Sequence, residues 1–249
     1  MGVIGGIDPV VTDGLVLYVD PSNQPRFYTS GSSTLKDMSG LENDITLVNY
    51  PLYGTSSNSS NAYISSDNSN TRYLTFDQNG EDNLGTVAQT GYDSYTGHRD
   101  SNFTYQLWVN TSESNASGDG RPLIGQGGGN IFSLVTLAAG KFTFRYFSGS
   151  WTNRSATTTI NDGNWHNLIL IYSAGTVDMY VDGNKEVDAG SGYWSNAARW
   201  QKLGHLGRNN NGGSITKSSI KFGPVKVYDR ALSQAEVLQN YNALKDRFV

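Results

Sequence analysis

The sequence predicts an all-β protein, a two-sheet antiparallel sandwich with one C-terminal helix. Most segments alternate between apolar and polar residues with a period of two, which is the pattern of half-buried strands. The strand signals follow one another across short turns, without helical crossovers between them, so neighbouring strands are expected to run antiparallel. A single helix signal stands near the end of the chain.

The strand pattern is repeated along the whole chain. Two pairs of strands are joined by compact turns at residues 139–141 and 173–175, and Asp182-Gly183 opens a third turn of the Asp-Gly kind. Residues 54–70 and 110–120, rich in Ser and Asn, are predicted as loops. The predicted strands are residues 15–19, 73–76, 103–109, 131–137, 142–147, 168–172, 176–181 and one within 215–228.

The helix is signalled by its own capping pattern. Ser233 and Glu236 have the spacing of a capping box, and Leu232 and Val237 have the spacing of a hydrophobic staple. One apolar stripe follows, which must pack on another surface. That surface is either the protein's own sandwich or a partner. The stripe consists of Val237, Tyr241, Leu244 and Phe248.

Composition excludes several classes of protein. The 249 residues contain no cysteine, which excludes a disulfide scaffold, a Cys-ligated metal site and a cysteine nucleophile. The net charge is −4 and no cluster of Lys and Arg occurs, so a nucleic-acid partner is not expected. The sequence contains no run of about 18 apolar residues, the length that a membrane-spanning helix needs.

The chain reads as one domain, residues 14–249, preceded by an N-terminal arm, residues 1–13. No internal repeat or linker divides it. The start of the sequence lacks a secretory signal, so synthesis and folding in a cytoplasm are expected. The arm contains several apolar residues, and two alternatives follow: it orders on a neighbouring subunit, or it forms a strand or lid on its own sandwich.

Several motifs in register resemble a known family. Residues 162–168 (DGNWHNL) and 176–183 (TVDMYVDG) resemble its central hairpin, and residues 35–44 resemble a loop after its first strand. Residues 74–77, 103–109 and 225–237 resemble three further segments. Together, residues 14–245 resemble the laminin-G-like, concanavalin A-like lectin/glucanase jelly rolls. The resemblance implies a jelly-roll sandwich, and we expect Trp108 and Trp165 as core residues between the sheets and His166 as a structural residue.

The same fold hosts glycoside hydrolases, which need paired carboxylates. Glu186 and Asp188 match half of the carboxylate pattern of the related glucanases, but Gly190 and Ser191 stand where the third carboxylate belongs. We therefore expect no enzyme activity and no catalytic residues.

No cofactor is expected either. Many relatives bind calcium, but residues 221–225 (KFGPV) occupy the place of the usual acidic pair. This pattern does not favour calcium, and Asp77, Asp82 and Asp93 are the alternative ligands.

Binding is the remaining chemistry. Aromatic residues in polar loops can stack on sugar rings, and here they predict a contact site for a glycan or a protein partner; local packing is the alternative. The candidates are Tyr92, Tyr95, Trp151, Tyr193 and Trp194.

The C-terminal segment adds a second resemblance. Residues 233–248 resemble the endings of laminin-G-like proteins from tailed bacteriophages. This implies a non-enzymatic virion structural protein, a capsid decoration, head-fibre or tail component, whose partners are other virion proteins or copies of itself. The protein would be made in the host cytoplasm and located in the virion. The alternative is a carbohydrate-binding adhesin module that recognises cell-surface glycans.

Overall fold

The structure is a computed structural model, and it describes the chain in several stretches. The described residues are 9–21, 34–46, 62–66, 72–76, 89–90, 102–113, 121–125, 133–147, 150–188, 205–206, 208–211, 214–217 and 220–248.

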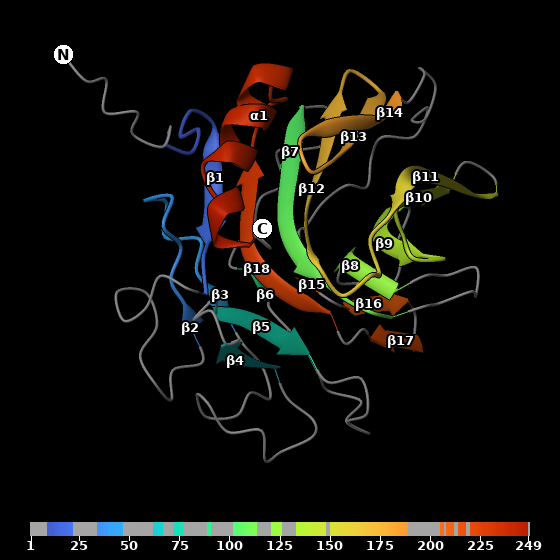
Figure 1. Cartoon of the computed structure of the whole chain (residues 1–249), viewed down its shortest axis with the longest axis horizontal. Coiled ribbons are helices and arrows are strands. Elements are labelled where there is room, and N and C mark those ends of the chain that lie inside the picture. The colour runs from blue at the N-terminus through green and yellow to red at the C-terminus, as the bar shows by residue number, and fades with distance from the viewer. Residues whose placement is uncertain are drawn as a thin grey trace.

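The larger sheet has eight antiparallel strands among the described residues, in the order β14-β13-β12-β7-β18-β5-β4, with β1 paired to β18 (Figure 1). Its centre is formed by long strands far apart in the sequence, which makes it the scaffold of the molecule. Its strands are β1 (Leu15–Val19), β4 (Ala62–Ser66), β5 (Arg72–Phe76), β7 (Phe103–Asn110), β12 (Trp165–Ser173), β13 (Thr176–Val181), β14 (Asn184–Asp188) and β18 (Lys221–Tyr228).

The smaller sheet has five antiparallel strands in the order β11-β10-β9-β8-β15 and packs against one face of the larger sheet (Figure 1). Its strands are β8 (Arg121–Gly125), β9 (Ser133–Ala138), β10 (Lys141–Phe147), β11 (Trp151–Thr159) and β15 (His205–Leu206). Short strands make two further ladders: β2 (Thr34–Leu35), β3 (Ile45–Thr46) and β6 (Gln89–Thr90) in one, β16 (Arg208–Asn211) and β17 (Ser214–Lys217) in the other. The predicted all-β, two-sheet antiparallel sandwich is confirmed.

The predicted tight turns are also confirmed. Ala139-Gly140, Ala174-Gly175 and Asp182-Gly183 each have positive φ at both residues. This is the backbone of a two-residue hairpin whose twist matches that of its strands. These turns fix the registers of β9 with β10, β12 with β13 and β13 with β14.

The last strand, expected within residues 215–228, is β18, and residues 214–217 form the separate short strand β17 in another sheet. Two segments predicted as loops contain strands. Residues 62–66, predicted as loop, form β4 because they pair along the whole length of β5. Residues 151–153, also predicted as loop, begin β11, a polar strand at the edge of the smaller sheet.

The main core fills the space between the two sheets. Alternate residues of β7, β12 and β18 supply one side of it, and Phe142, Phe144 and Ala156 supply the other. These side chains are almost completely removed from water. The buried apolar area is the principal stabilising contribution to a chain without disulfides.

The loop between β2 and β3 is organised by one carboxylate. Asp37 accepts backbone N–H bonds from Tyr18 (2.8 Å), Ser39 (2.9 Å) and Asn43 (3.0 Å). The Asn43 side chain in turn donates to the carbonyl of Val16 at 2.8 Å. The motif in residues 35–44 therefore ties this loop to the first strand.

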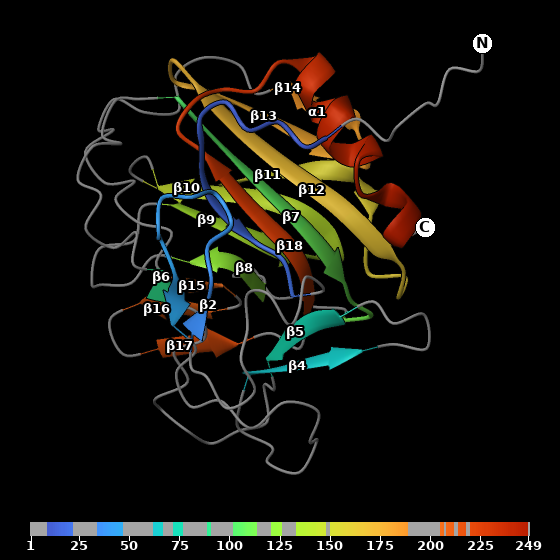
Figure 2. The ribbon, with the colours of Figure 1, turned by 90° about the vertical axis from the view of Figure 1, so that its left-hand side faces the viewer.

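The predicted helix is α1 (Gln234–Asn242), and it covers the outer face of the larger sheet (Figure 2). Ser233 and Glu236 form the capping box in both directions. Val237 and Leu232 join a second apolar cluster on that face. The helix ends earlier than the apolar stripe, and a 3-10 turn, η2 (Lys245–Arg247), leads to Phe248. The stripe packs on the protein's own sandwich.

Residues 9–11 lie along the same face. The Val11 N–H donates to Oδ1 of Asn240 at 2.8 Å, and the Gln239 side chain donates to the carbonyl of Pro9 at 2.7 Å. The Tyr228 hydroxyl donates to the carbonyl of Val11 at 3.1 Å. Residues 1–8 lie outside the described residues, so the arm as a whole stays a prediction. Among the described helices, none is long and apolar enough to cross a bilayer.

Candidate functional site

Four of the five predicted contact residues lie outside the described residues. They are Tyr92, Tyr95, Tyr193 and Trp194. Trp151 is the first residue of β11 and pairs with Phe147 of β10, but its side chain is not described. The three calcium alternatives, Asp77, Asp82 and Asp93, also lie outside the described part. These residues therefore stay predictions.

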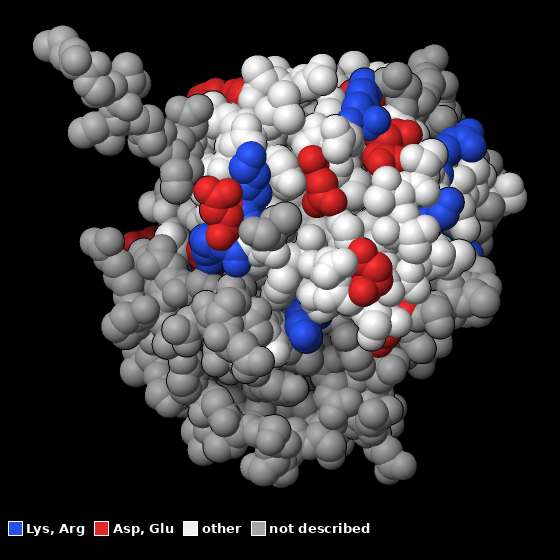
Figure 3. All heavy atoms as spheres, in the orientation of Figure 1, with Lys and Arg blue, Asp and Glu red and all other residues white. Residues whose placement is uncertain are grey.

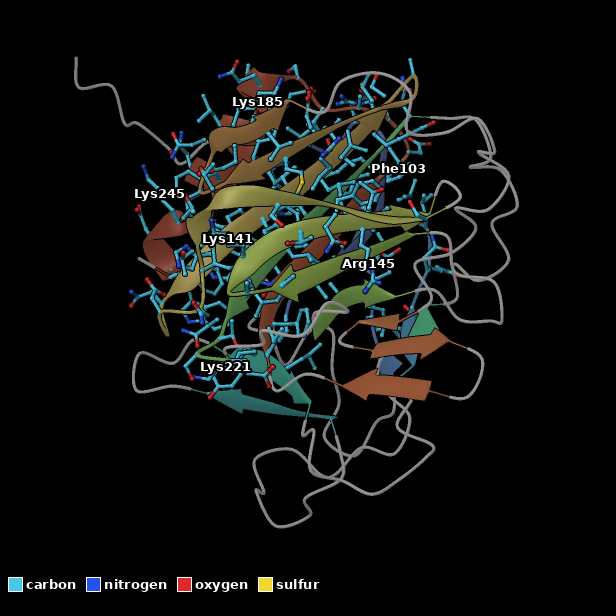
Figure 4. The ribbon with its side chains drawn as sticks, turned by 90° about the vertical axis from the view of Figure 1, so that its right-hand side faces the viewer. Phe103, Lys141, Arg145, Lys185, Lys221 and Lys245 are labelled. Carbon is cyan, nitrogen blue, oxygen red and sulfur yellow. The ribbon has the colours of Figure 1, made fainter. Side chains whose placement is uncertain are left out.

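The outer face of the smaller sheet carries a set of polar groups, here called the polar face: Lys141, Thr143, Arg145, Asn153 and Ser155. On β10 they alternate with Phe142 and Phe144, which point into the core. The β10–β11 register places Thr143 opposite Ser155 and Arg145 opposite Asn153. Figure 4 views the molecule from this side and shows Lys141 and Arg145 toward opposite ends of β10.

The polar face combines different hydrogen-bonding groups within two adjacent strands. The Thr143 and Ser155 hydroxyls lie 2.8 Å apart. Asn153 and Ser155 are exposed, Lys141 and Arg145 are half-buried, and Thr143 is buried. An amide, two hydroxyls, a guanidinium and an ammonium can together donate to and accept from a ligand rich in oxygen atoms. The sequence did not indicate this face, because β11 carries few apolar residues and resembles a loop.

The candidate catalytic carboxylate has a structural role. The Glu186 carboxylate, on β14, accepts from the backbone N–H groups of Thr157 (3.0 Å) and Thr158 (3.2 Å) and from both their hydroxyls. Because β14 is an edge of the larger sheet and β11 an edge of the smaller one, the hydrogen bonds of Glu186 link the edges of the two sheets. Burial raises the pKa of Glu186, but the bonds from Thr157 and Thr158 outweigh it and the net pKa lies below the usual range.

His166 is held by two carboxylates at one end of the larger sheet. Its Nδ1 lies 2.7 Å from Asp182 Oδ2, and its Nε2 lies 3.2 Å from Asp162 Oδ1. The bond to Asp182 is the main cause of a raised His166 pKa; burial works against it. Asp182 also accepts the Asn167 N–H at 2.7 Å. In the part of the chain that the structure describes, no group of His, Cys, Asp and Glu has the arrangement of a metal site.

Trp108 and Trp165 were expected between the two sheets, but neither belongs to the core there. Trp108 is completely buried, but it faces outward between Leu107 and Val109, which point into the core. Phe248 stacks on it with ring centroids 4.5 Å apart, and Tyr241 stacks at 5.8 Å. Trp165 is half-buried and meets Phe248 at 5.0 Å. The expectation failed because the sequence does not show that residues 244–248 fold back over the sheet.

This fold-back depends on a glycine. A Cβ at Gly223 of β18 would lie 3.0 Å from Trp108 Cβ and 3.2 Å from Phe248 Cζ. Residues 244–248, here called the C-terminal segment, thus cover an aromatic part of the larger sheet. Figure 3 shows acidic and basic side chains mixed on the described surface of this side, without a large basic area.

Comparison with known proteins places the fold. No curated protein matches the sequence. The binding domain of Paraclostridial Mosquitocidal Protein 1 is 16% identical, with a TM-score of 0.61 over 93% of this chain and 52% of that one. The binding domain of botulinum neurotoxin DC, solved with rat synaptotagmin II, is 12% identical, with a TM-score of 0.60 over 94% of this chain and 52% of that one.

An enzyme is also among the similar structures. Trypanosoma rangeli sialidase in complex with sialic acid is 16% identical, with a TM-score of 0.57 over 98% of this chain and 37% of that one. The chain thus spans about half or less of the length of these three proteins. At such identities the likeness shows a shared lectin-like sandwich fold.

The sequence itself also matches a family model. The match covers residues 89–238, which include the β12–β13 hairpin, β18 and the start of α1. The chain belongs to the concanavalin A-like lectin/glucanases superfamily.

Proposed function

We propose that this protein is a non-enzymatic recognition module that binds an oligosaccharide on a cell surface through the polar face of its smaller sheet. The observation that carries the proposal is the set of hydroxyl, amide and cationic groups that β10 and β11 present on the outer face of a lectin-like sandwich. Sugars present many hydroxyl groups, which such a mixed set of donors and acceptors can satisfy.

Two further observations support a binding role. Two of the similar structures are binding domains of toxins. The Glu186 carboxylate, the best candidate for catalysis in the sequence, is occupied by four hydrogen bonds between the sheets. Trp151 begins β11, two positions before Asn153, so the predicted aromatic contact belongs to the same strand as the polar face.

A glycan array tests this function. The full chain is applied to neutral and acidic oligosaccharides, beside the variants Trp151→Ala, Asn153→Ala and Arg145→Gln, with Gln234→Ala on the exposed side of α1 as the matched control. We expect binding by the parent and control proteins and a loss of about threefold to tenfold in each of the three variants, since a lost hydrogen bond of about 0.5–1.5 kcal/mol changes the dissociation constant by roughly this factor. A flat array, or binding that all three variants retain, contradicts the proposal.

A structural role in a virion is the second candidate, and the N-terminal residues favour it. Pro9 and Val11 are bound to α1 and Tyr228, while Pro9 itself is exposed. We propose that residues 1–8, which precede these bonds in the sequence, contact a neighbouring copy or another virion protein. Such a role would agree with the resemblance of residues 233–248 to bacteriophage proteins.

Removal of residues 1–8 tests the virion role, because it leaves the bonds of residues 9–11 in place. We expect the shortened chain to fold with an unchanged melting temperature but to lose its self-association, or its incorporation into purified phage particles. Normal assembly of the shortened chain would contradict this role and leave the glycan proposal untouched.

A further inference from the structure

A lysine is buried on the outer face of the larger sheet, and among the described residues it has no hydrogen-bond partner. Lys226 lies in the middle of β18, and none of its surface is exposed. The register places it between Tyr18 of β1 and Gln106 of β7. Its Nζ lies 4.9 Å from the centre of the Tyr18 ring, and no polar atom of the described residues accepts a hydrogen bond from it.

One carboxylate lies close to this amine, and it is already paired. The Asp20 side chain, 2% exposed, accepts two bonds from the Arg247 guanidinium, at 2.7 and 2.9 Å. Arg247 belongs to η2 in the C-terminal segment, and its side chain is 32% exposed. The Tyr18 hydroxyl lies 3.4 Å from Asp20.

The other titratable groups that face Lys226 are neutral near neutral pH. Burial raises the pKa of the Tyr18 hydroxyl, and the neighbouring Asp20 charge raises it further. Burial likewise raises the pKa of Tyr228, two residues along β18. From β7 the facing residue is Gln106, which does not titrate. Among the described residues, the charged groups that act on this cluster are therefore Asp20, Arg247 and Lys226.

The net charge of the three groups is zero only when Lys226 is uncharged, because the charges of Asp20 and Arg247 then cancel. When Lys226 takes up a proton, two cations share one carboxylate, and a buried uncompensated charge is costly. The excess charge is removed at the lowest free-energy cost when Arg247, which is already partly exposed, moves into water. The backbone of Lys226 is held in a central strand, and its ammonium group can then pair with Asp20 in place of Arg247.

We propose that Lys226 is a proton-controlled switch that releases the C-terminal segment from the larger sheet. With neutral Lys226, Arg247 is bound to Asp20, and Phe248 is held on Trp108 and Trp165. With protonated Lys226, Arg247 leaves, and Phe248 leaves with it. The release uncovers the Trp108 and Trp165 rings and Gly223 as an aromatic surface. This switch is independent of the proposed glycan site, which lies on the other sheet.

The position of the switch on the pH scale follows from the environment of the amine. Burial lowers the pKa of Lys226 to about 7; the Asp20 charge raises it and the Arg247 charge lowers it further. Within the segment, η2 is a single turn without a side-chain cap, and Leu244 is the segment's buried residue.

The absence of cysteine from the chain makes a direct test simple. Asp246→Cys introduces one thiol at an exposed position beside Arg247, where a nitroxide spin label reports the mobility of the segment. Spectra of the full chain are recorded between about pH 5.5 and pH 9. We expect an immobile label at the alkaline end, a several-fold larger mobile fraction at the acidic end, and a midpoint near pH 7.

Three variants in the labelled background decide the cause. Lys226→Met keeps the shape of the side chain without the proton and should leave the label immobile throughout. Phe248→Ala should give a mobile label at every pH and defines the released signal. His166→Gln removes the histidine that lies next to Trp165, and its transition should match that of the parent protein.

Two results would overturn the switch. One is a parent protein whose label mobility does not change over this pH range. The other is a transition that persists in Lys226→Met or disappears in His166→Gln. Since the first result needs only the parent protein, the proposal can fail even if Lys226→Met does not fold.

Discussion

At the scale of single residues, the structure changes what a sequence motif means. Glu186 has the sequence context of a catalytic carboxylate, yet its two oxygens are committed to Thr157 and Thr158 across the sandwich edge. Hydrogen bonds to a charged group are among the stronger ones, although solvent weakens them at a partly exposed site.

Glu186→Ala should therefore lower the free energy of unfolding by about 1–2 kcal/mol, because four donors lose their shared acceptor. Urea denaturation of the parent and variant proteins measures the change. Gln234→Ala, at an exposed position of α1, is the control and should leave stability within about 0.5 kcal/mol of the parent. Equal stabilities of the two variants would show that the hydrogen bonds of Glu186 to β11 do not contribute to the free energy of unfolding.

His166 is the second residue with a measurable consequence. Its folded-state pKa lies above the ordinary value of 6.5, chiefly because of the bond to Asp182. The contribution of protonated His166 to stability is therefore complete below about pH 6.5 and is lost as the pH rises through the folded-state pKa.

The expected result is a parent protein that loses stability, relative to Asp182→Asn, as the pH is raised from about 6 to 8. Asn tolerates the positive φ of 51° at position 182, so the variant removes the carboxylate charge without straining the turn. Chemical denaturation at a series of pH values gives both curves. Parallel curves would mean that the Asp182 carboxylate does not set the His166 pKa.

At the scale of elements, the position of the C-terminal segment depends on the surface of the larger sheet on which it packs. Phe248 approaches β18 closely only because residue 223 has no side chain. The stacking of Phe248 on Trp108 at 4.5 Å thus depends on a glycine in a strand that otherwise carries bulky residues.

Gly223→Ala should push Phe248 away from Trp108 and lower the free energy of unfolding by about 1–3 kcal/mol, the usual cost of overpacking. Thermal denaturation measures the loss, and a double-mutant cycle with Phe248→Ala gives its origin. The cost of the alanine should shrink in the Phe248→Ala background. An unchanged cost would place the clash at Trp108 alone.

At the scale of the whole molecule, the buried lysine makes global stability depend on pH. The folded state holds Lys226 with a pKa of about 7, against 10.5 for a free side chain. Between these values the unfolded chain binds more protons than the folded chain, so this group makes stability rise with pH, and the effect ends below about pH 7.

Lys226→Met should raise the free energy of unfolding by about 1–3 kcal/mol at pH 7, because an apolar side chain of similar length removes an unsatisfied buried amine. The gain should decrease from about pH 7 to pH 9. Denaturation of parent and variant over this range measures it, and the difference between them cancels the opposite effect of His166. A variant less stable than the parent at pH 7 contradicts the argument.

Local patterns in the sequence are enough to predict the class of fold, the tight turns and the capped helix. Each is a local signal: period-two alternation, a residue pair able to adopt positive φ, and a Ser-Glu spacing of three. Its family motifs likewise identified the superfamily. The sequence pattern did not predict the polar face, because β11 is a polar edge strand that is stabilised by pairing with β10 and not by apolar residues of its own.

Tertiary structure alone decided where the key side chains meet. Glu186 reaches Thr157 only because two sheet edges adjoin. Trp108 faces the C-terminal segment only because residues about 140 positions later fold back over β7. The Asp20–Lys226–Arg247 cluster joins the first strand, the last strand and the end of the chain. Such contacts depend on long-range packing, in which each partner's position is set by the whole sandwich, so no local pattern in the sequence encodes them.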